Sequence, residues 1–210
     1  HDLDRFQVFL RLLAGRIGQV LNYTSLSNDI GVSSTTVKNW IAVLKASFVC
    51  FELPPFFENI RKRVTKSPKL FFYDVGLATY LLGIESVDQF KRDPLRGNLY
   101  ENLVVLEVLK SCLNHGMAGD LFFYRDTHGN EVDLIIRRGR TLHPVEIKSA
   151  STFTPDHLKG IEQFKSAVGD SCGAPQVCYN GDCELRFRNA LVHNPFLTDT
   201  FDKLALCGQT

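Results

Sequence analysis

The sequence has few features that would direct the protein to a membrane or to a strongly charged partner. No apolar run reaches the roughly 18 residues that a membrane-spanning helix needs. The start of the chain, charged from its second residue, does not resemble a signal peptide. The formal net charge is only +1, so the whole chain has no electrostatic preference for nucleic acid or for a membrane surface. We therefore expect a cytoplasmic protein with no membrane partner.

Two motifs with well-defined chemistry are also missing. The six cysteines include no C-x-x-C pair, and the spacing of Cys172, Cys178 and Cys183 matches zinc-binding motifs poorly. Buried, reduced thiols are therefore expected, with a metal site formed by these cysteines and His193 as the alternative. The phosphate-binding motif G-x-x-x-x-G-K-[ST] does not occur in the 210 residues, so the chain alone is not expected to hydrolyse ATP.

Charge is distributed unevenly along the chain. Residues 1–73 carry a formal charge of +5, which leaves about −4 for the remainder. Hydrophobic residues make up 44% of the sequence, which is enough for a globular core in each part. A connection that contains proline and glycine near residue 90 separates two patterns of secondary structure. We therefore expect one domain over residues 1–90 and a second over residues 91–210.

The first part has the pattern of a winged helix-turn-helix domain. A short helix is predicted over residues 24–30, a turn at Gly31, and a second helix from a cap at Ser33 to about Ala46. Strands then flank a basic loop, which fits the wing. A packing module without DNA contact is the alternative. The residues expected to contact DNA are Ser34, Thr35, Lys38 and Asn39 in the second helix and Arg61, Lys62, Arg63 and Lys66 in the loop.

The second part is predicted to be a layered α/β core. A long, largely apolar helix comes first, with the sequence NLYENLVVLEVLKSCLNHG. Strands are expected over residues 121–125, 131–137 and 142–148. A helix that begins after Thr154 and Pro155 follows, and then two strands with the sequences QVCYN and ELRFR. The fold class is therefore mixed α/β (α+β).

The stretch GNEVDLIIRRGRTLHPVEIKSA, residues 129–150, predicts a hairpin in which each strand carries an acidic residue within an apolar run. The Gly-Arg dipeptide at positions 139 and 140 is typical of a two-residue turn. Counting back along both strands from that turn places Asp133 directly opposite Glu146, with Lys148 on the same face.

Two carboxylates that face one another in a sheet repel each other. At about 4 Å the repulsion is roughly 1 kcal/mol in water and about 4 kcal/mol at the effective dielectric of a protein surface. Three arrangements would offset it. Lys148 and nearby arginines could neutralise the pair in a structural ion network, one carboxyl could stay protonated, or a divalent cation could bridge the two. A solvated hairpin face is the alternative to a metal site. Ligands that are all oxygen atoms point to Mg²⁺ or Mn²⁺ rather than zinc.

The hairpin motif Asp-x12-Glu-x-Lys, with a helix carrying a glutamate before it and another helix after it, resembles the PD-(D/E)xK nuclease superfamily, which includes restriction endonucleases. More narrowly, the segments GNLYENLV, FFYRDTHGNEVDLII and HPVEIKSA are similar to the uncharacterised C-terminal region of predicted AAA+ ATPases. In that family a winged helix precedes a restriction-endonuclease-like α/β core. The resemblance therefore covers nearly the whole chain.

The resemblance implies a role for each residue of the motif. Asp133 and Glu146 would bind the metal ion together with the backbone carbonyl of Ile147. Lys148 would orient the hydrolytic water and stabilise charge on the phosphate. Glu101 matches the acidic residue of the first helix and would provide a further ligand. The alternative for Glu101 is a capping box, because N-x-x-E stands near the expected start of that helix.

The function implied by the resemblance is metal-dependent cleavage of DNA, with Mg²⁺ or Mn²⁺ as the cofactor and DNA as the partner. This chain is expected to be the C-terminal part of a longer protein, in which an N-terminal ATPase domain would bind ATP. The residue before Asp133 is Val132, where the motif has proline. The alternative is a catalytically inactive DNA-binding or regulatory protein-interaction module of the ATPase, because one fold hosts both active and inactive members.

Overall fold

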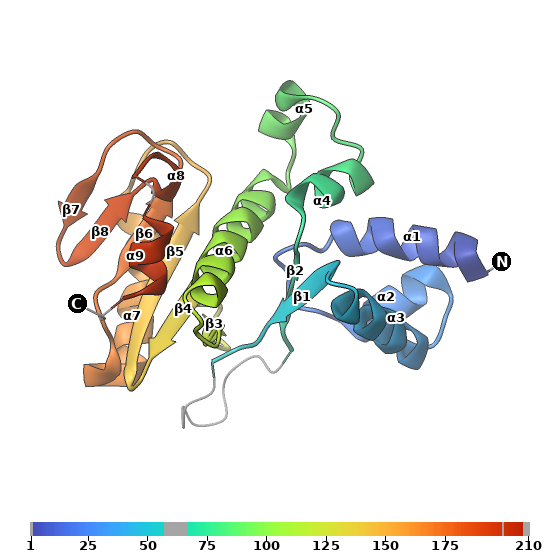
Figure 1. Cartoon of the computed structure of the whole chain (residues 1–210), viewed down its shortest axis with the longest axis horizontal. Coiled ribbons are helices and arrows are strands. Elements are labelled where there is room, and N and C mark those ends of the chain that lie inside the picture. The colour runs from blue at the N-terminus through green and yellow to red at the C-terminus, as the bar shows by residue number, and fades with distance from the viewer. Residues whose placement is uncertain (1, 57–66, 199, 208–210) are drawn as a thin grey trace. The chain divides into compact units, whose positions relative to one another are not determined.

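A computed structural model describes residues 2–56, 67–198 and 200–207 of the chain (Figure 1). These residues have a mixed α+β architecture and divide into two compact units. The first unit contains the described residues 2–53 and 67–102, and the second contains the described residues 54–56, 103–198 and 200–207. The division falls within helix α6 (Arg96–Asn114), so this helix contributes residues to both units.

Three helices begin the first unit: α1 (Asp2–Ala14), α2 (Tyr23–Ile30) and α3 (Ser34–Ala46). The side chain of Asn22 caps α2 by accepting from the backbone N–H of Ser25, and Ser33 caps α3 in the same way. Gly31 ends α2 with a φ of 72°, a left-handed conformation that glycine adopts without strain. The predicted short helix, turn and Ser33-capped helix are therefore confirmed.

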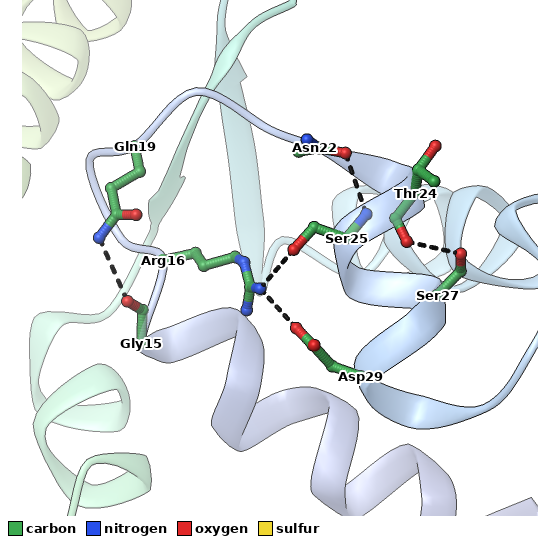
Figure 2. Close-up of polar contacts among 8 residues, drawn as sticks. All are labelled: Gly15, Arg16, Gln19, Asn22, Thr24, Ser25, Ser27 and Asp29. Atoms are coloured by element: carbon green, nitrogen blue, oxygen red, sulfur yellow. Dashed lines mark hydrogen bonds and ion pairs between the residues drawn. The ribbon is translucent and has the colours of Figure 1, made fainter.

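Arg16, just after α1, holds α2 in place (Figure 2). Its Nη2 donates to Ser25 Oγ at 3.0 Å and to Asp29 Oδ2 at 2.6 Å, so one guanidinium joins both ends of the short helix. Apolar side chains from α1, α2 and α3 form the core beneath these polar contacts, including Phe9, Leu26 and Ile41.

The remainder of the first unit is built around an antiparallel pair of strands, β1 (Cys50–Leu53) and β2 (Lys69–Phe72). A bridge joins Val20, between α1 and α2, to Lys69 on β2. Helices α4 (Val75–Leu81) and α5 (Val87–Arg92) follow, and α5 was not predicted. Helix α6 begins at Arg96, where Asp93 Oδ1 accepts from the N–H of Leu95 at 2.7 Å. Asn98 therefore lies inside the helix, and the capping-box alternative for Glu101 is wrong.

The strands of the second unit form a mixed sheet in the order β3-β4-β5-β6-β8-β7 (Figure 1). β3, β4 and β5 form an antiparallel meander, and β6 and β8 continue it in parallel pairing. The predicted strands are confirmed, but β8 was missed, and it separates β6 from β7. The bounds are β3 (Leu121–Arg125), β4 (Glu131–Arg138), β5 (Thr141–Lys148), β6 (Gln176–Tyr179), β7 (Leu185–Phe187) and β8 (Ala190–His193).

One face of this sheet is covered by the 3₁₀ helix η1 (Pro155–Leu158) and by α7 (Lys159–Val168). Leu158, Ile161 and Phe164 pack there against strand residues that include Leu142 and Val177. Short helices α8 (Pro195–Thr198) and α9 (Phe201–Ala205) end the described part of the unit. β4 and β5 are buried along most of their length, and the buried residues are consecutive, so side chains on both faces of these strands are shielded from solvent.

No helix among the described residues is long and apolar enough to cross a lipid bilayer. The longest apolar segment of the helices lies in α6, where the valines at 104, 105 and 108 are buried within the protein.

Candidate functional site

The candidate site lies at the open end of the β4–β5 hairpin. The strands pair from Arg138 and Thr141, beside the turn, to Leu134 and Val145. Gly139 has a φ of 59°, as the first position of the predicted two-residue turn requires. The predicted turn and register are therefore confirmed over this part of the hairpin.

The register becomes irregular at the position of Asp133. On the β3 side, Phe122 pairs with Ile135 but Tyr124 pairs with Val132, so β4 has one extra residue between these two pairs. Continuing the β4–β5 ladder would give the N–H of Ile147 a backbone partner at Val132. Instead this N–H donates to Asp133 Oδ2 at 2.9 Å. The regular pairing thus stops before Asp133 and Glu146, and the carboxylate of Asp133 takes the place of a backbone acceptor.

Both acidic side chains are buried, and Lys148 contacts both. Asp133 is 9% exposed and Glu146 is 8% exposed. Lys148 Nζ lies 2.5 Å from Glu146 Oε1 and 3.5 Å from Asp133 Oδ2. Lys148 is the last residue of β5, and its side chain is about one-third exposed. Of the arrangements considered from the sequence, a solvated acidic face is therefore wrong, because burying a charge is costly unless it has a partner.

The donor atoms of this hairpin fit a hard divalent cation. Asp133 and Glu146 offer carboxylate oxygens, and Ile147, between Glu146 and Lys148, offers a backbone carbonyl. Mg²⁺ is commonly held by one or two carboxylates while water fills its other positions. The described residues contain no cluster of three or more His, Cys, Asp or Glu side chains that could hold a metal ion. An ion at the hairpin would therefore depend on these few oxygen ligands.

Glu101 belongs to the first unit, where it forms a buried ion pair. Its Oε1 accepts from Lys69 Nζ at 2.8 Å, and the side chains are 11% and 4% exposed. The next residue, Asn102, is fully buried and bonds through its amide to both the N–H and the C=O of Phe72. These contacts attach α6 to β2. The metal-ligand role of Glu101 stays a prediction.

The residues predicted to contact DNA lie partly on α3. Thr35, Lys38 and Asn39 are exposed, whereas Ser34 is half-buried and its Oγ lies 3.1 Å from Ser27 Oγ. Lys38 Nζ sits 5.4 Å from the centre of the Tyr23 ring. The predicted wing residues Arg61, Lys62, Arg63 and Lys66 lie outside the described residues.

The cysteine and histidine residues near the end of the chain have structural surroundings. Burial raises the pKa of the Cys178 thiol, which lies 3.9 Å from His193 Nε2. His193 Nε2 also lies 3.1 Å from Gln176 Oε1, and its Nδ1 lies 3.0 Å from Thr200 Oγ1. Burial lowers the pKa of His193. Cys183 is exposed, and within the described residues these side chains do not gather into a metal site.

One residue near the hairpin was not singled out from the sequence. His157 lies on η1, which returns to pack against β5 after the chain leaves Lys148. Burial lowers the pKa of His157, and the nearby Lys148 ammonium lowers it further. The eight residues between Lys148 and His157 follow no recognised motif, so no local pattern in the sequence could have linked the two.

Comparisons with known proteins match both parts of the chain. Residues 1–88 match a family described as a domain of unknown function (DUF8612), and residues 96–197 match another, DUF4143. Uncharacterized proteins of Mycobacterium tuberculosis and Mycobacterium bovis are each 33% identical over 141 residues, which cover 67% of the chain and 31% of each relative. An uncharacterized protein of Methanocaldococcus jannaschii is 26% identical over 170 residues, or 80% of the chain and 34% of the relative. The chain thus spans about a third of the length of these curated relatives.

Proposed function

We propose that the hairpin is a divalent-cation-dependent site that hydrolyses phosphodiester bonds of DNA, in a nuclease-like domain of the PD-(D/E)xK type. The observation that carries the proposal is the meeting of Asp133, Glu146 and Lys148 at one end of the hairpin, with Lys148 in contact with both buried carboxylates. Burying two acids beside a lysine needs a reason, because an apolar cluster of similar size is usually as stable. A catalytic role provides that reason.

Each side chain has a separate task in this proposal. Asp133 and Glu146, with the carbonyl of Ile147, would hold Mg²⁺ or Mn²⁺. The bound ion would act as a Lewis acid on a phosphoryl oxygen. The N–H of Ile147 fixes the orientation of the Asp133 carboxylate, because Oδ2 accepts its hydrogen. Lys148 would donate to a phosphate oxygen or to the attacking water, and so stabilise the negative charge that develops during the reaction.

The first unit supports DNA as the substrate. The order α1, Val20 bridge, α2, α3, β1 and β2 agrees with a winged helix-turn-helix domain, in which α3 would enter the major groove. Thr35, Lys38 and Asn39 are exposed on α3. The excess of positive charge over residues 1–73 would favour the approach of a polyanion.

We also propose that the chain acts as the C-terminal part of an ATPase. The resemblance of its sequence to the C-terminal region of predicted AAA+ ATPases supports this proposal. Its match to only about a third of each relative's length agrees with it. ATP would then be bound by an N-terminal domain of the same protein, which could drive movement along the DNA while the hairpin cuts it.

The proposal is tested by Mn²⁺ calorimetry and by DNA cleavage. We expect the chain to bind Mn²⁺ and to cut plasmid DNA only when a divalent ion is present. Glu146→Gln should lose both properties, because it removes a charged ligand and keeps the shape of the side chain. Lys148→Met should keep Mn²⁺ binding and lose roughly 10²- to 10³-fold in cleavage rate, the usual loss when one stabilising donor is removed.

Asp120→Asn is a suitable control, because Asp120 pairs with Arg137 close to the other end of the hairpin and has no part in the proposed site. It should behave as the unmodified chain does. Failure of that chain to bind Mn²⁺, or cleavage that persists in Glu146→Gln, would refute the proposal.

A second candidate function is a non-catalytic DNA-binding or regulatory module. The observation that favours it is the same lysine contact: Lys148 by itself offsets part of the repulsion between Asp133 and Glu146 without a metal. This candidate predicts DNA binding that weakens steeply with salt and does not depend on Mg²⁺. It also predicts that Lys148→Met destabilises the fold and that divalent ions do not change the melting temperature.

A further inference from the structure

The 3₁₀ helix η1 covers the face of the sheet that carries Lys148. Leu142, Glu146 and Lys148 share one face of β5, because side chains alternate along a strand. Leu142 belongs to the same apolar cluster as Leu158 of η1. The segment that contains His157 therefore packs over the face of β5 on which the candidate site lies.

A glycine brings the following helix close to β4 as well. A methyl group at Gly160 would lie 1.9 Å from the carbonyl oxygen of Glu131, so the residue at this position must lack a side chain. Glu131 is two residues before Asp133 on β4. His157, three residues before Gly160, thus belongs to a segment that contacts β5 through η1 and approaches Glu131 of β4 at Gly160.

The hydrogen bonding of His157 leaves one ring nitrogen as a donor. The backbone N–H of Thr154 donates to His157 Nδ1 at 3.5 Å, and the ring meets Phe153 edge-on at 5.7 Å between centroids. The neutral tautomer that accepts at Nδ1 carries its proton on Nε2. The ring keeps this neutral form near pH 7, because burial and then Lys148 lower its pKa more than Asp156 raises it. Asp156 is itself paired with Lys159 at 3.0 Å.

We infer that His157 contacts the substrate. Its Nε2 would donate a hydrogen bond to a phosphate of the DNA strand that neighbours the phosphate bound by Lys148. This inference rests on the proposed function. Donors to two neighbouring phosphates would hold the strand more firmly than Lys148 alone, since a hydrogen bond to a charged oxygen is stronger than one between neutral groups. His157 would then set how the strand is positioned, while Lys148 acts on the phosphate that reacts.

Binding can be measured without cleavage by following the histidine ring signals in NMR spectra. The full chain is labelled with ¹³C-histidine and titrated with a short DNA duplex in EDTA. We expect the Cε1–H signal of His157 to shift and reach saturation, and the pKa of His157 to rise in the complex because a phosphate is then nearby. Lys148→Met should weaken this response. His115 serves as the internal reference. It lies between α6 and β3, and the first residue of β3 pairs with Ile136, which is nearer the hairpin turn than the candidate site is.

Kinetics of cleavage with Mn²⁺ provide the second measurement. His157→Leu should raise KM for a duplex substrate about tenfold with little change in kcat, as expected when a binding contact is lost. His157→Gln should recover most of the affinity, because the amide –NH₂ of glutamine can replace the Nε2–H donor. A role in proton transfer predicts the opposite, because glutamine cannot exchange a proton. His115→Leu is the matched control and should leave both constants unchanged.

The outcomes separate this inference from the proposed function. If the unmodified chain cleaves DNA, yet His157→Leu cleaves equally well and the His157 signal does not shift, the inference is wrong and the proposed function stands. If the chain cuts no DNA but DNA still shifts His157 in a manner that depends on Lys148, the phosphate contact holds and the nuclease proposal fails. If DNA neither is cut nor shifts His157, both are wrong.

Discussion

Asp133 Oδ2 accepts a hydrogen bond from the backbone N–H of Ile147 across the hairpin, with 2.9 Å between the two atoms. Asp133 therefore has a structural role as well as the proposed metal-binding role. It completes the strand pairing where the extra residue of β4 interrupts the regular ladder. The two roles depend on different properties of the side chain: the hydrogen bond needs an oxygen acceptor, and the metal needs a negative charge.

Two different substitutions of Asp133 should separate these roles. Asp133→Asn keeps an acceptor for the N–H of Ile147, so we expect a nearly unchanged urea midpoint together with loss of Mn²⁺ binding in calorimetry. Asp133→Ala removes the acceptor as well and leaves a buried N–H unsatisfied, which costs about 1–3 kcal/mol of unfolding free energy. Equal stability of the two variants would contradict the structural role. Retained Mn²⁺ binding in Asp133→Asn would contradict the metal site.

The hairpin was predictable because its information is local. The Gly-Arg turn and the alternation of apolar residues fix the register from Arg138–Thr141 to Leu134–Val145 without help from the rest of the protein. The irregular pairing near Asp133 was not predictable, because it is defined by the pairing of β4 with β3, and the alternating pattern of β4 does not reveal it. Local capping residues likewise made α2 and α3 predictable.

Contacts between distant parts of the chain could not be predicted in the same way. Lys69 and Glu101 are 32 residues apart, and both residue types are usually found at the surface. The position of β8 between β6 and β7 depends on pairing within the sheet, which four residues of sequence do not specify. His157 comes near Lys148 only because η1 packs back on β5. In each case, tertiary packing brings together residues that the sequence pattern treats as unrelated.

The Lys69–Glu101 ion pair should be important for the stability of the first unit. Glu101→Gln would leave the buried Lys69 ammonium without its carboxylate partner, and we expect a loss of about 3–5 kcal/mol, as for other buried pairs that lose one member. The double variant Lys69→Met with Glu101→Gln should recover part of that loss, because the buried charge of Lys69 is also removed. Urea unfolding of the single and double variants measures this coupling. A double variant whose loss equals the sum of the single losses would argue against an energetic pair.

The stability of the second unit should fall in mild acid partly because of His143. Burial lowers the pKa of this side chain from its usual value of about 6.5, and Arg138 lowers it further. Its Nε2 is buried and has no hydrogen-bond partner among the described residues. The folded protein therefore resists protonation of His143, whereas the unfolded chain accepts the proton. This contribution is fully present above about pH 6.5 and is lost as the pH falls below that value.

Urea unfolding at a series of pH values between 7.5 and 5 tests this assignment. His143→Leu removes the titrating group, so its stability should decline less steeply with acidification than that of the unmodified chain. His115→Leu, at an exposed position, is the control and should keep the original slope. Identical slopes for all three proteins would show that His143 does not contribute to the pH dependence.

The last prediction concerns the exposed face of α3 and its binding of DNA. Lys38 is exposed, and its ammonium lies over the Tyr23 ring, so it is held near the surface that would face a DNA groove. If Lys38 contacts a phosphate, Lys38→Gln should weaken duplex binding similarly for all sequences. It should also reduce the slope of log affinity against log salt by about 1, because one fewer counterion is released.

Fluorescence anisotropy at several salt concentrations gives both quantities. Lys91→Gln, which removes an equal charge from the exposed surface of α5, serves as the control and should leave the slope unchanged. An equal reduction in both variants would mean that only the overall charge of the chain attracts DNA. An unchanged slope in Lys38→Gln would remove α3 from the DNA interface. The first unit would then be left as a packing module, and the hairpin would have to recognise its substrate without it.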